Sequence, residues 1–221
     1  MSQSVRILDI RPVTHNVRHY RLEKPEGYEF QPGQATELSI DAEGFRHRKN
    51  PFTFTGLAED PYLEFTIKSY FDRDGVTRRL WELKPGDRLL LREPWGTITY
   101  KGPGVFLAGG AGVTPFIAIL RRLAKDGKLK GHRLIASNRT ERDIILRDEF
   151  ENMEGLDHDW VISGDPNTQL YRGRIDEDFL THRVMDFSQN FYVCGPDQMV
   201  KDLRSTLERL GAKAESVTFE K

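Results

Sequence analysis

Hydrophobic residues along the first hundred positions follow the short, alternating pattern of β-strands. Turn signals rich in Pro and Gly separate the apolar segments, at 24–27, 31–34 and 84–87, and one helical patch interrupts them at 76–82. The expected strands are Val5–Asp9, Val17–Glu23, Ala35–Ile40, Phe52–Thr55, Leu63–Ser69, Arg88–Arg92 and Thr97–Tyr100. Many short strands at this spacing predict a small antiparallel β-barrel.

The pattern changes after residues 101–103, where apolar strands begin to alternate with helices. The expected strands are Val105–Ala108, His132–Ser137, Trp160–Ser163 and Phe191–Cys194. The expected helices begin at Pro115 or lie near Ile144–Met153, Asp176–Thr181 and Asp197–Leu210. This alternation predicts parallel βαβ units. We therefore expect an antiparallel β-barrel domain at 1–102 and a parallel-sheet α/β domain at 103–221.

The stretch 104–127 combines a buried strand, a glycine-rich turn and the start of an amphipathic helix. After Val105–Ala108 come three residues at which the backbone can turn sharply and approach a ligand, Gly109, Gly110 and Gly112. Thr114 and Pro115 suit the N-cap and first helical positions, and Gly127 ends the helix. Free amides and the positive end of the helix dipole predict a phosphate site. The alternative is a strand-to-helix turn that binds nothing.

This turn differs from the usual dinucleotide fingerprint. Pro115 stands where that motif needs Gly or Ala, and no acidic residue closes the second strand.

Composition narrows the class of protein. The 221 residues carry a net charge of −1, which provides no general attraction to nucleic acid or to a membrane surface. No apolar run approaches the roughly 20 residues of a membrane span, and the N-terminus lacks a secretory apolar core, so we expect a cytoplasmic protein. The single cysteine, Cys194, excludes an internal disulfide and a four-cysteine iron–sulfur cluster within this sequence, and no metal site is predicted.

Five motifs follow one another along nearly the whole chain: Asn50-Pro51-Phe52-Thr53, Gly75-Val76-Thr77, Gly110-x-Gly112-x-Thr114-Pro115, Cys194-Gly195-Pro196 and Phe219 near the C-terminus. In this order they resemble the motifs of the ferredoxin/flavodoxin–NADP reductase family. The resemblance implies that the first two motifs bind FAD in the β-barrel domain. It implies that the next two bind NADPH, with NADH possible, in the α/β domain.

The resemblance also implies roles at the reacting centre. Phe52 would lie beside the isoalloxazine, and Thr53 would place a hydroxyl near flavin N5; the alternatives are a barrel-core Phe and a surface-strand Thr. Cys194 and Gly195 would form a small wall for the nicotinamide, although Cys194 is equally well read as an inert buried thiol. Phe219 would shield the flavin or be a plain strand residue. Further cofactor contacts are expected at Pro51, Ile67, Lys68, Ser69, Val76, Pro196 and Met199.

One position departs from the family pattern. The flavin-motif arginine, which meets flavin phosphate, is Asn50 here. Arg48 lies two residues earlier, and in an extended strand it would point to the same side and compensate. The choice between FAD and FMN stays open.

The segment after the second α/β strand predicts which nicotinamide is used. Ser137, Arg139 and Arg142 are residue types that bind a 2′-phosphate, and they favour NADPH. Glu141 could instead pair with an arginine or bind the ribose, and a solvated charged loop is the remaining alternative.

The leading hypothesis is therefore a flavoprotein oxidoreductase that transfers hydride from NADPH to FAD and then single electrons to a separate carrier, such as ferredoxin or flavodoxin. The alternatives are a reductase component for an oxygenase, a free-flavin reductase, and a non-enzymatic nucleotide-binding regulatory protein.

Overall fold

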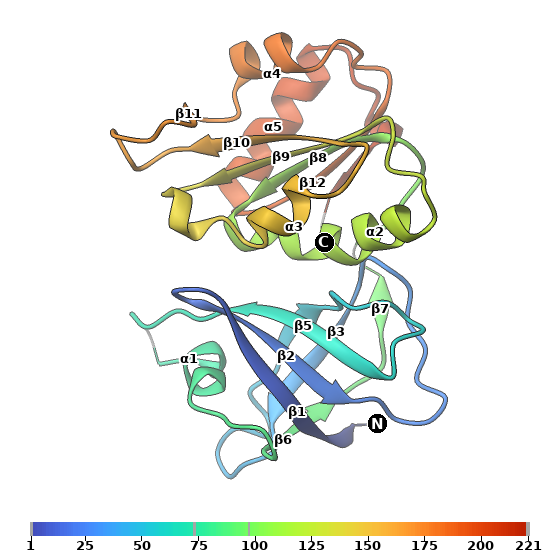
Figure 1. Cartoon of the computed structure of the whole chain (residues 1–221), viewed down its shortest axis with the longest axis vertical. Coiled ribbons are helices and arrows are strands. Elements are labelled where there is room, and N and C mark those ends of the chain that lie inside the picture. The colour runs from blue at the N-terminus through green and yellow to red at the C-terminus, as the bar shows by residue number, and fades with distance from the viewer. Residues whose placement is uncertain (1, 73, 97, 220–221) are drawn as a thin grey trace. The chain divides into compact units, whose positions relative to one another are not determined.

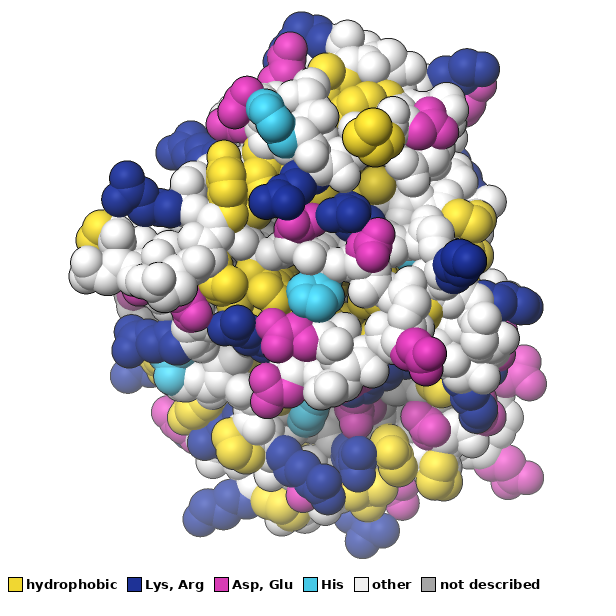
Figure 2. All heavy atoms as spheres, turned by 45° about the horizontal axis from the view of Figure 1, so that its top comes forward, with side chains coloured by type: hydrophobic (Ala, Val, Ile, Leu, Met, Phe, Trp, Pro, Cys, Tyr) yellow, Lys and Arg dark blue, Asp and Glu magenta, His cyan; other side chains and the backbone are white. Residues whose placement is uncertain are grey.

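The computed structural model describes residues 2–72, 74–96 and 98–219. The chain divides into two compact units, the first made of Met1–Thr97 with Thr114–Arg122 and the second of Ile98–Val113 with Leu123–Lys221. In the part of the chain described, no helix has both the length and the apolar character needed to cross a bilayer. On the face shown in Figure 2, acidic and basic side chains are interspersed, in keeping with the near-zero net charge.

The first unit is built on an antiparallel, barrel-like sheet with one short helix, α1 (Val76–Trp81), beside it (Figure 1). Its strands are β1 (Gln3–Thr14), β2 (Val17–Glu23), β3 (Gln34–Ile40), β4 (Asn50–Thr53), β5 (Tyr62–Lys68), β6 (Arg88–Leu91) and β7 (Trp95–Gly96). They are ordered β4-β3-β6-β1-β2-β5, with β7 paired to β3. One bridge, Phe54 to Phe65, links the two ends of this order. The predicted antiparallel, barrel-like fold class is confirmed.

The alternation of side chains between the two faces of each strand explains which residues form the core of this unit. Along β5, Leu63, Phe65 and Ile67 are almost fully buried in the apolar core. Strand β1 is longer than expected because it serves two neighbours: residues 3–6 pair with β6 and residues 7–14 pair with β2.

The expected strand at 97–100 is wrong for residues 98–100, which form no strand; Thr97 lies outside the described residues. Side-chain contacts within the second unit hold this segment in place of a backbone ladder. The Tyr100 hydroxyl lies 2.8 Å from His132 Nε2, and the Lys101 amide donates to the Tyr192 hydroxyl.

The second unit is built on a parallel sheet ordered β11-β10-β9-β8-β12-β13. Its strands are β8 (Gly104–Gly109), β9 (His132–Asn138), β10 (Leu156–Ile162), β11 (Tyr171–Arg172), β12 (Asn190–Cys194) and β13 (Val217–Phe219). Helices α4 (Glu177–Arg183) and α5 (Asp197–Arg209) lie on one face of the sheet and α3 (Arg147–Glu151) on the other (Figure 1). The predicted parallel α/β architecture is confirmed.

The strand order reverses at β8, which lies between β9 and β12. In open α/β sheets, ligands bind outside the carboxyl ends of the strands where the order reverses. The turns after β8 and β12 therefore lie where a nucleotide is expected.

Two predicted helix starts are corrected. Helix α2 (Thr114–Lys125) follows directly on a 3-10 turn at Gly110–Val113, so Thr114 is its first residue and not an N-cap. Helix α3 is shorter than expected because Leu146, with φ 54°, interrupts the regular backbone before it.

Candidate functional site

Strand β4 presents the residues of the expected flavin motif. Phe52 is half-buried and packs against the core of the first unit, while Thr53 is only 7% exposed. The Thr53 hydroxyl makes no side-chain hydrogen bond to another described residue. Pro51 is exposed, and Asn50 begins the strand opposite Leu38. A nearly buried hydroxyl with an unused donor fits the expected flavin contact.

Arg48 does not lie on this strand. It follows a turn closed by the Arg48 amide and the Phe45 carbonyl, and β4 begins only at Asn50. The premise that Arg48 and Asn50 project to the same side of one extended strand is therefore wrong. The Arg48 guanidinium lies 5.0 Å from the Phe45 ring centroid, a cation–π contact.

A side-chain hydrogen bond links the end of β5 to the start of α1. Ser69 is buried, and its hydroxyl donates a hydrogen bond of 2.8 Å to the Thr77 carbonyl. Ile67 lies in the core, and Lys68 ends the strand with a half-buried side chain. The Ser69–Thr77 hydrogen bond links the two segments on which the FAD contacts are expected, one with Ile67, Lys68 and Ser69 and the other with Gly75, Val76 and Thr77.

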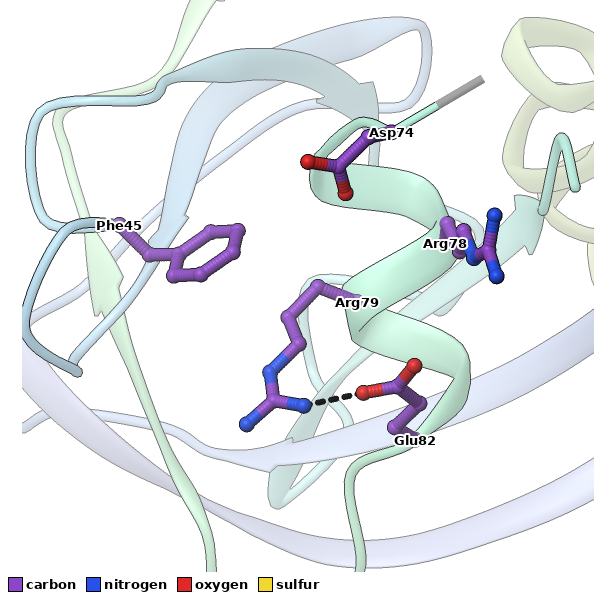
Figure 3. A pocket seen from close by; sticks show the side chains of 5 residues that line it. All are labelled: Phe45, Asp74, Arg78, Arg79 and Glu82. Carbon is purple, nitrogen blue, oxygen red and sulfur yellow. Dashed lines mark hydrogen bonds and ion pairs between the residues drawn. The ribbon is translucent and has the colours of Figure 1, made fainter. Parts of the chain in front are cut away.

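A cavity of about 370 Å³ opens beside α1. It is lined by Phe45, Asp74, Arg78, Arg79 and Glu82 (Figure 3). Arg79 pairs with Glu82, and its guanidinium lies 5.9 Å from the Phe45 ring centroid. Arg48 and Arg79 thus both approach the Phe45 ring. Sequence reasoning did not single out Phe45 or Arg79, because the turn that carries Phe45 matches no motif.

In the second unit, glycines let two turns pack closely. A Cβ on Gly112 would lie 2.3 Å from the Cys194 carbonyl oxygen, and one on Gly109 would lie 2.5 Å from Met199 Sδ. Gly110 has φ +53°, and nothing lies within 4 Å of its Cβ position. Gly112 therefore allows close backbone packing, and Gly109 leaves room for the side chains of Met199 and Pro196. The space beside Gly110 stays open, as a bound phosphate requires.

The turn after β12 carries the remaining nicotinamide motif. Cys194 is 1% exposed at the strand end, and Pro196 occupies the position before α5. Gly195 lies against Gly109, where a Cβ would be 3.0 Å from the Gly109 nitrogen. The structure thus brings Gly112, Cys194, Gly195 and Met199 together at the reversal of strand order.

The acidic and basic side chains that follow β9 differ in whether they are paired. Glu141 is engaged through both carboxylate oxygens, accepting from the Thr168 hydroxyl at 2.6 Å and from Arg147 at 3.2 Å. The hydrogen bond from Thr168 and the contact with Arg147 hold the pKa of Glu141 below its usual range. Within the described ranges, the exposed guanidinium groups of Arg139 and Arg142 form no hydrogen bond or ion pair. Ser137, on β9, is half-buried.

Phe219 lies on β13, where it pairs with Val193 of β12. Arg204 of α5 lies over its ring at 5.6 Å. Phe219 also packs against the core of the second unit.

A buried charge cluster escaped the sequence analysis. Glu64, on β5, is 4% exposed and contacts Arg121 at 2.5 Å and Arg21 at 3.2 Å. Burial alone would raise its pKa, but Arg121, with His19 and Arg21, holds that pKa below its ordinary value. Side-chain alternation along β5 places Glu64 on the face that points away from the core, so the pattern predicts that its side chain is solvated.

Comparisons with known proteins agree with this geometry. Residues 106–205 match a family model described as the oxidoreductase NAD-binding domain. The chain is 28% identical to the reductase component of propane 2-monooxygenase from Rhodococcus jostii (strain RHA1), over 98% of this chain and 62% of the relative. It is 25% identical to the ferredoxin–NAD(P)(+) reductase component of the naphthalene 1,2-dioxygenase system of Pseudomonas putida, over 96% of this chain and 66% of the relative.

Among solved structures, the fold matches the flavohem-like FAD/NAD-binding domain of nitric oxide dioxygenase from Vibrio cholerae O1 biovar El Tor. The TM-score is 0.87 at 19% identity, with 99% of this chain and 97% of that chain covered. The chain thus spans about two thirds of the two curated relatives and nearly all of this domain. Residues 106–205 thus match an oxidoreductase NAD-binding domain, and the whole chain is similar to the reductase components of two oxygenase systems and shares the fold of an FAD/NAD-binding domain.

Proposed function

We propose that this protein is an NAD(P)H-dependent flavoprotein oxidoreductase that uses FAD and passes electrons to a separate acceptor. The observation that carries the proposal is the close packing of Gly112 on Cys194 at the carboxyl ends of β8 and β12, beside the open turn at Gly110. The relatives and the FAD/NAD-binding domain with the same fold support it. Purified protein should be yellow, and NADPH should bleach it anaerobically; colourless protein that binds no added flavin would overturn the proposal.

When bound, FAD and nicotinamide supply hydride transfer and one-electron chemistry, so the chain's own residues mainly bind and orient. On this proposal Thr53 offers its unused hydroxyl to the flavin ring, and Phe52 flanks that ring. Gly75, Val76 and Thr77 hold the flavin phosphates, with Ser69 securing Thr77 through its carbonyl. Gly110, Thr114 and Pro115 would bind the nicotinamide dinucleotide, and Cys194 and Gly195 would line the site of its nicotinamide end.

The proposal also names two candidate classes of electron acceptor. A ferredoxin or flavodoxin suits a chain whose only cysteine excludes a four-cysteine cluster of its own. An oxygenase component is the second candidate, favoured by the name of the propane 2-monooxygenase relative, whereas the naphthalene dioxygenase relative is named for a ferredoxin. Steady-state reduction of purified ferredoxin, flavodoxin and oxygenase components, with NADPH as donor, would rank these acceptors.

Asn50→Arg is expected to tighten flavin binding about tenfold, because one charge-assisted hydrogen bond contributes about 1.5 kcal/mol. Arg48 lies off β4, so the new side chain should meet little crowding from it. Equilibrium dialysis of apoprotein against FAD and FMN measures the gain and names the preferred flavin. If Asn50→Arg gains nothing and Arg48→Ala binds as well as the parent, the phosphate does not lie here.

Thr53→Val should slow flavin reduction about fivefold while flavin content stays near normal, because one neutral hydrogen bond contributes about 1 kcal/mol. Stopped-flow reduction by NADPH measures the rate. Thr53→Ser is the matched control, since it retains the hydroxyl. Equal rates in Val and Ser variants would remove Thr53 from the flavin site.

A further inference from the structure

One carboxylate in the first unit joins residues from three segments. Glu64 Oε1 accepts a hydrogen bond from Arg121 of α2 at 2.5 Å, and Oε2 accepts one from Arg21 of β2 at 3.2 Å. His19 Nδ1 of β2 lies 3.8 Å from Oε1. The Glu64 side chain is only 5% exposed, so solvent screens these contacts little.

Arg121 also reaches the backbone that continues β4. The same guanidinium nitrogen donates to the Thr55 carbonyl at 2.8 Å, and the Thr55 amide donates to the Glu64 carbonyl at 2.8 Å. Thr55 is fully buried, and its hydroxyl accepts from Thr66 at 3.1 Å. Thr66 in turn lies 2.9 Å from His19 Nδ1. Thr55 is therefore held from its backbone and its side chain at once.

These contacts connect the two segments that carry candidate cofactor residues. Thr53 precedes Thr55 by two residues on the same extended segment, so a shift of Thr55 carries Thr53 with it. Arg121 lies two turns beyond Thr114 and Pro115 on one continuous helix. The regular backbone hydrogen bonds of the helix keep these residues in fixed relative positions. Fixing Arg121 against Thr55 therefore fixes Thr114 relative to Thr53.

We infer that Glu64 and Arg121 are positioning residues for hydride transfer, which set the geometry between the β4 segment and the start of α2. This inference rests on the proposed function. The pair is suited to this role because a buried carboxylate facing two guanidinium groups resists displacement: separating it from either group leaves a charge buried without its partner. Hydride transfer depends steeply on such placement.

The neighbouring ion pair provides a matched control. Arg122, the next residue of α2, pairs with Glu59, but these side chains are 33% and 40% exposed. An exposed pair contributes little to geometry or stability. Glu59→Gln therefore removes a charge from a more exposed ion pair on the same helix.

The test compares Arg121→Met, Arg121→Lys, Glu64→Gln and Glu59→Gln as flavin-loaded proteins. Anaerobic stopped-flow reduction over a range of NADPH concentrations separates the limiting rate from the nicotinamide Kd. Arg121→Met and Glu64→Gln should lower the limiting rate about 10- to 100-fold, with Kd changed less than about threefold. Arg121→Lys should recover part of the rate, and Glu59→Gln should match the parent within about twofold.

Hydrogen exchange supplies a readout that does not depend on turnover. In Arg121→Met, amides at 53–55 and 114–122 should exchange faster than in the parent, whereas Glu59→Gln should leave them unchanged. Unchanged exchange and rate in both Arg121→Met and Glu64→Gln overturn the inference, as does equal slowing by Glu59→Gln. If neither NADPH nor NADH reduces the parent protein, the proposed function is refuted instead. The hydrogen-exchange comparison alone would then decide whether Arg121 holds these segments in place.

Discussion

Gly112→Ala is expected to destabilise the parallel unit by about 3 kcal/mol and to abolish tight nicotinamide binding. The new Cβ would lie 2.3 Å from the Cys194 carbonyl oxygen and 2.7 Å from Gly195 Cα. Both neighbours are backbone atoms at the end of β12, and a strand paired on both sides cannot move aside without losing ladder hydrogen bonds. Thermal unfolding and NADPH titration of the purified variant measure the two effects.

Gly110→Ala is the matched control for this prediction. Nothing lies within 4 Å of its Cβ position, and only the φ of +53° opposes the substitution, at a cost of about 1 kcal/mol. Gly110→Ala should therefore lose less stability than Gly112→Ala. Equal losses would mean that backbone strain in the turn, and not packing against Cys194, is what the glycines relieve.

Arg139→Ala should reduce the preference for NADPH over NADH about 10- to 100-fold, the effect of losing one charge-assisted contact to the 2′-phosphate. Arg139 follows the carboxyl end of β9, where an acidic residue would select NADH. Its guanidinium is exposed and uncommitted to any described residue, so it is available to a phosphate. Arg142→Ala should have a smaller effect in the same direction.

The position of Glu141 strengthens this prediction. A carboxylate that already accepts from Thr168 and Arg147 is less available to a ribose hydroxyl, and part of its charge is neutralised by Arg147. The measurement is kcat/KM for both nicotinamides in the parent and variants. Lys130→Ala, which removes an exposed charge before the opposite end of β9, is the control. A parent that prefers NADH, or a ratio unmoved by Arg139→Ala, would contradict the assignment.

Much of the architecture was predictable because it depends on local periodicity. Two-residue alternation marked β2 at its observed bounds, and the 3.6-residue pattern marked α2 and α5. Glycines also mark turns locally: Gly127, just beyond α2, has φ +66°. The change from short strands to alternating strands and helices likewise predicted an antiparallel sheet followed by a parallel one. The motif glycines of the turns after β8 and β12 were visible in the sequence for the same reason.

Other features depend on which segments meet in space. The pattern along β5 could not reveal that Glu64 is buried, because its burial depends on Arg121, 57 positions away in sequence. The sequence also could not show that Arg48 lies in a turn beside Phe45 and not on β4. Nor could it show that Gly112 is needed because Cys194 packs against it. The sequence by itself determined most of the elements and the motif residues, since these follow from backbone propensity and periodicity. The tertiary structure decided the partners of those residues, since burial and charge pairing arise only when distant segments come together.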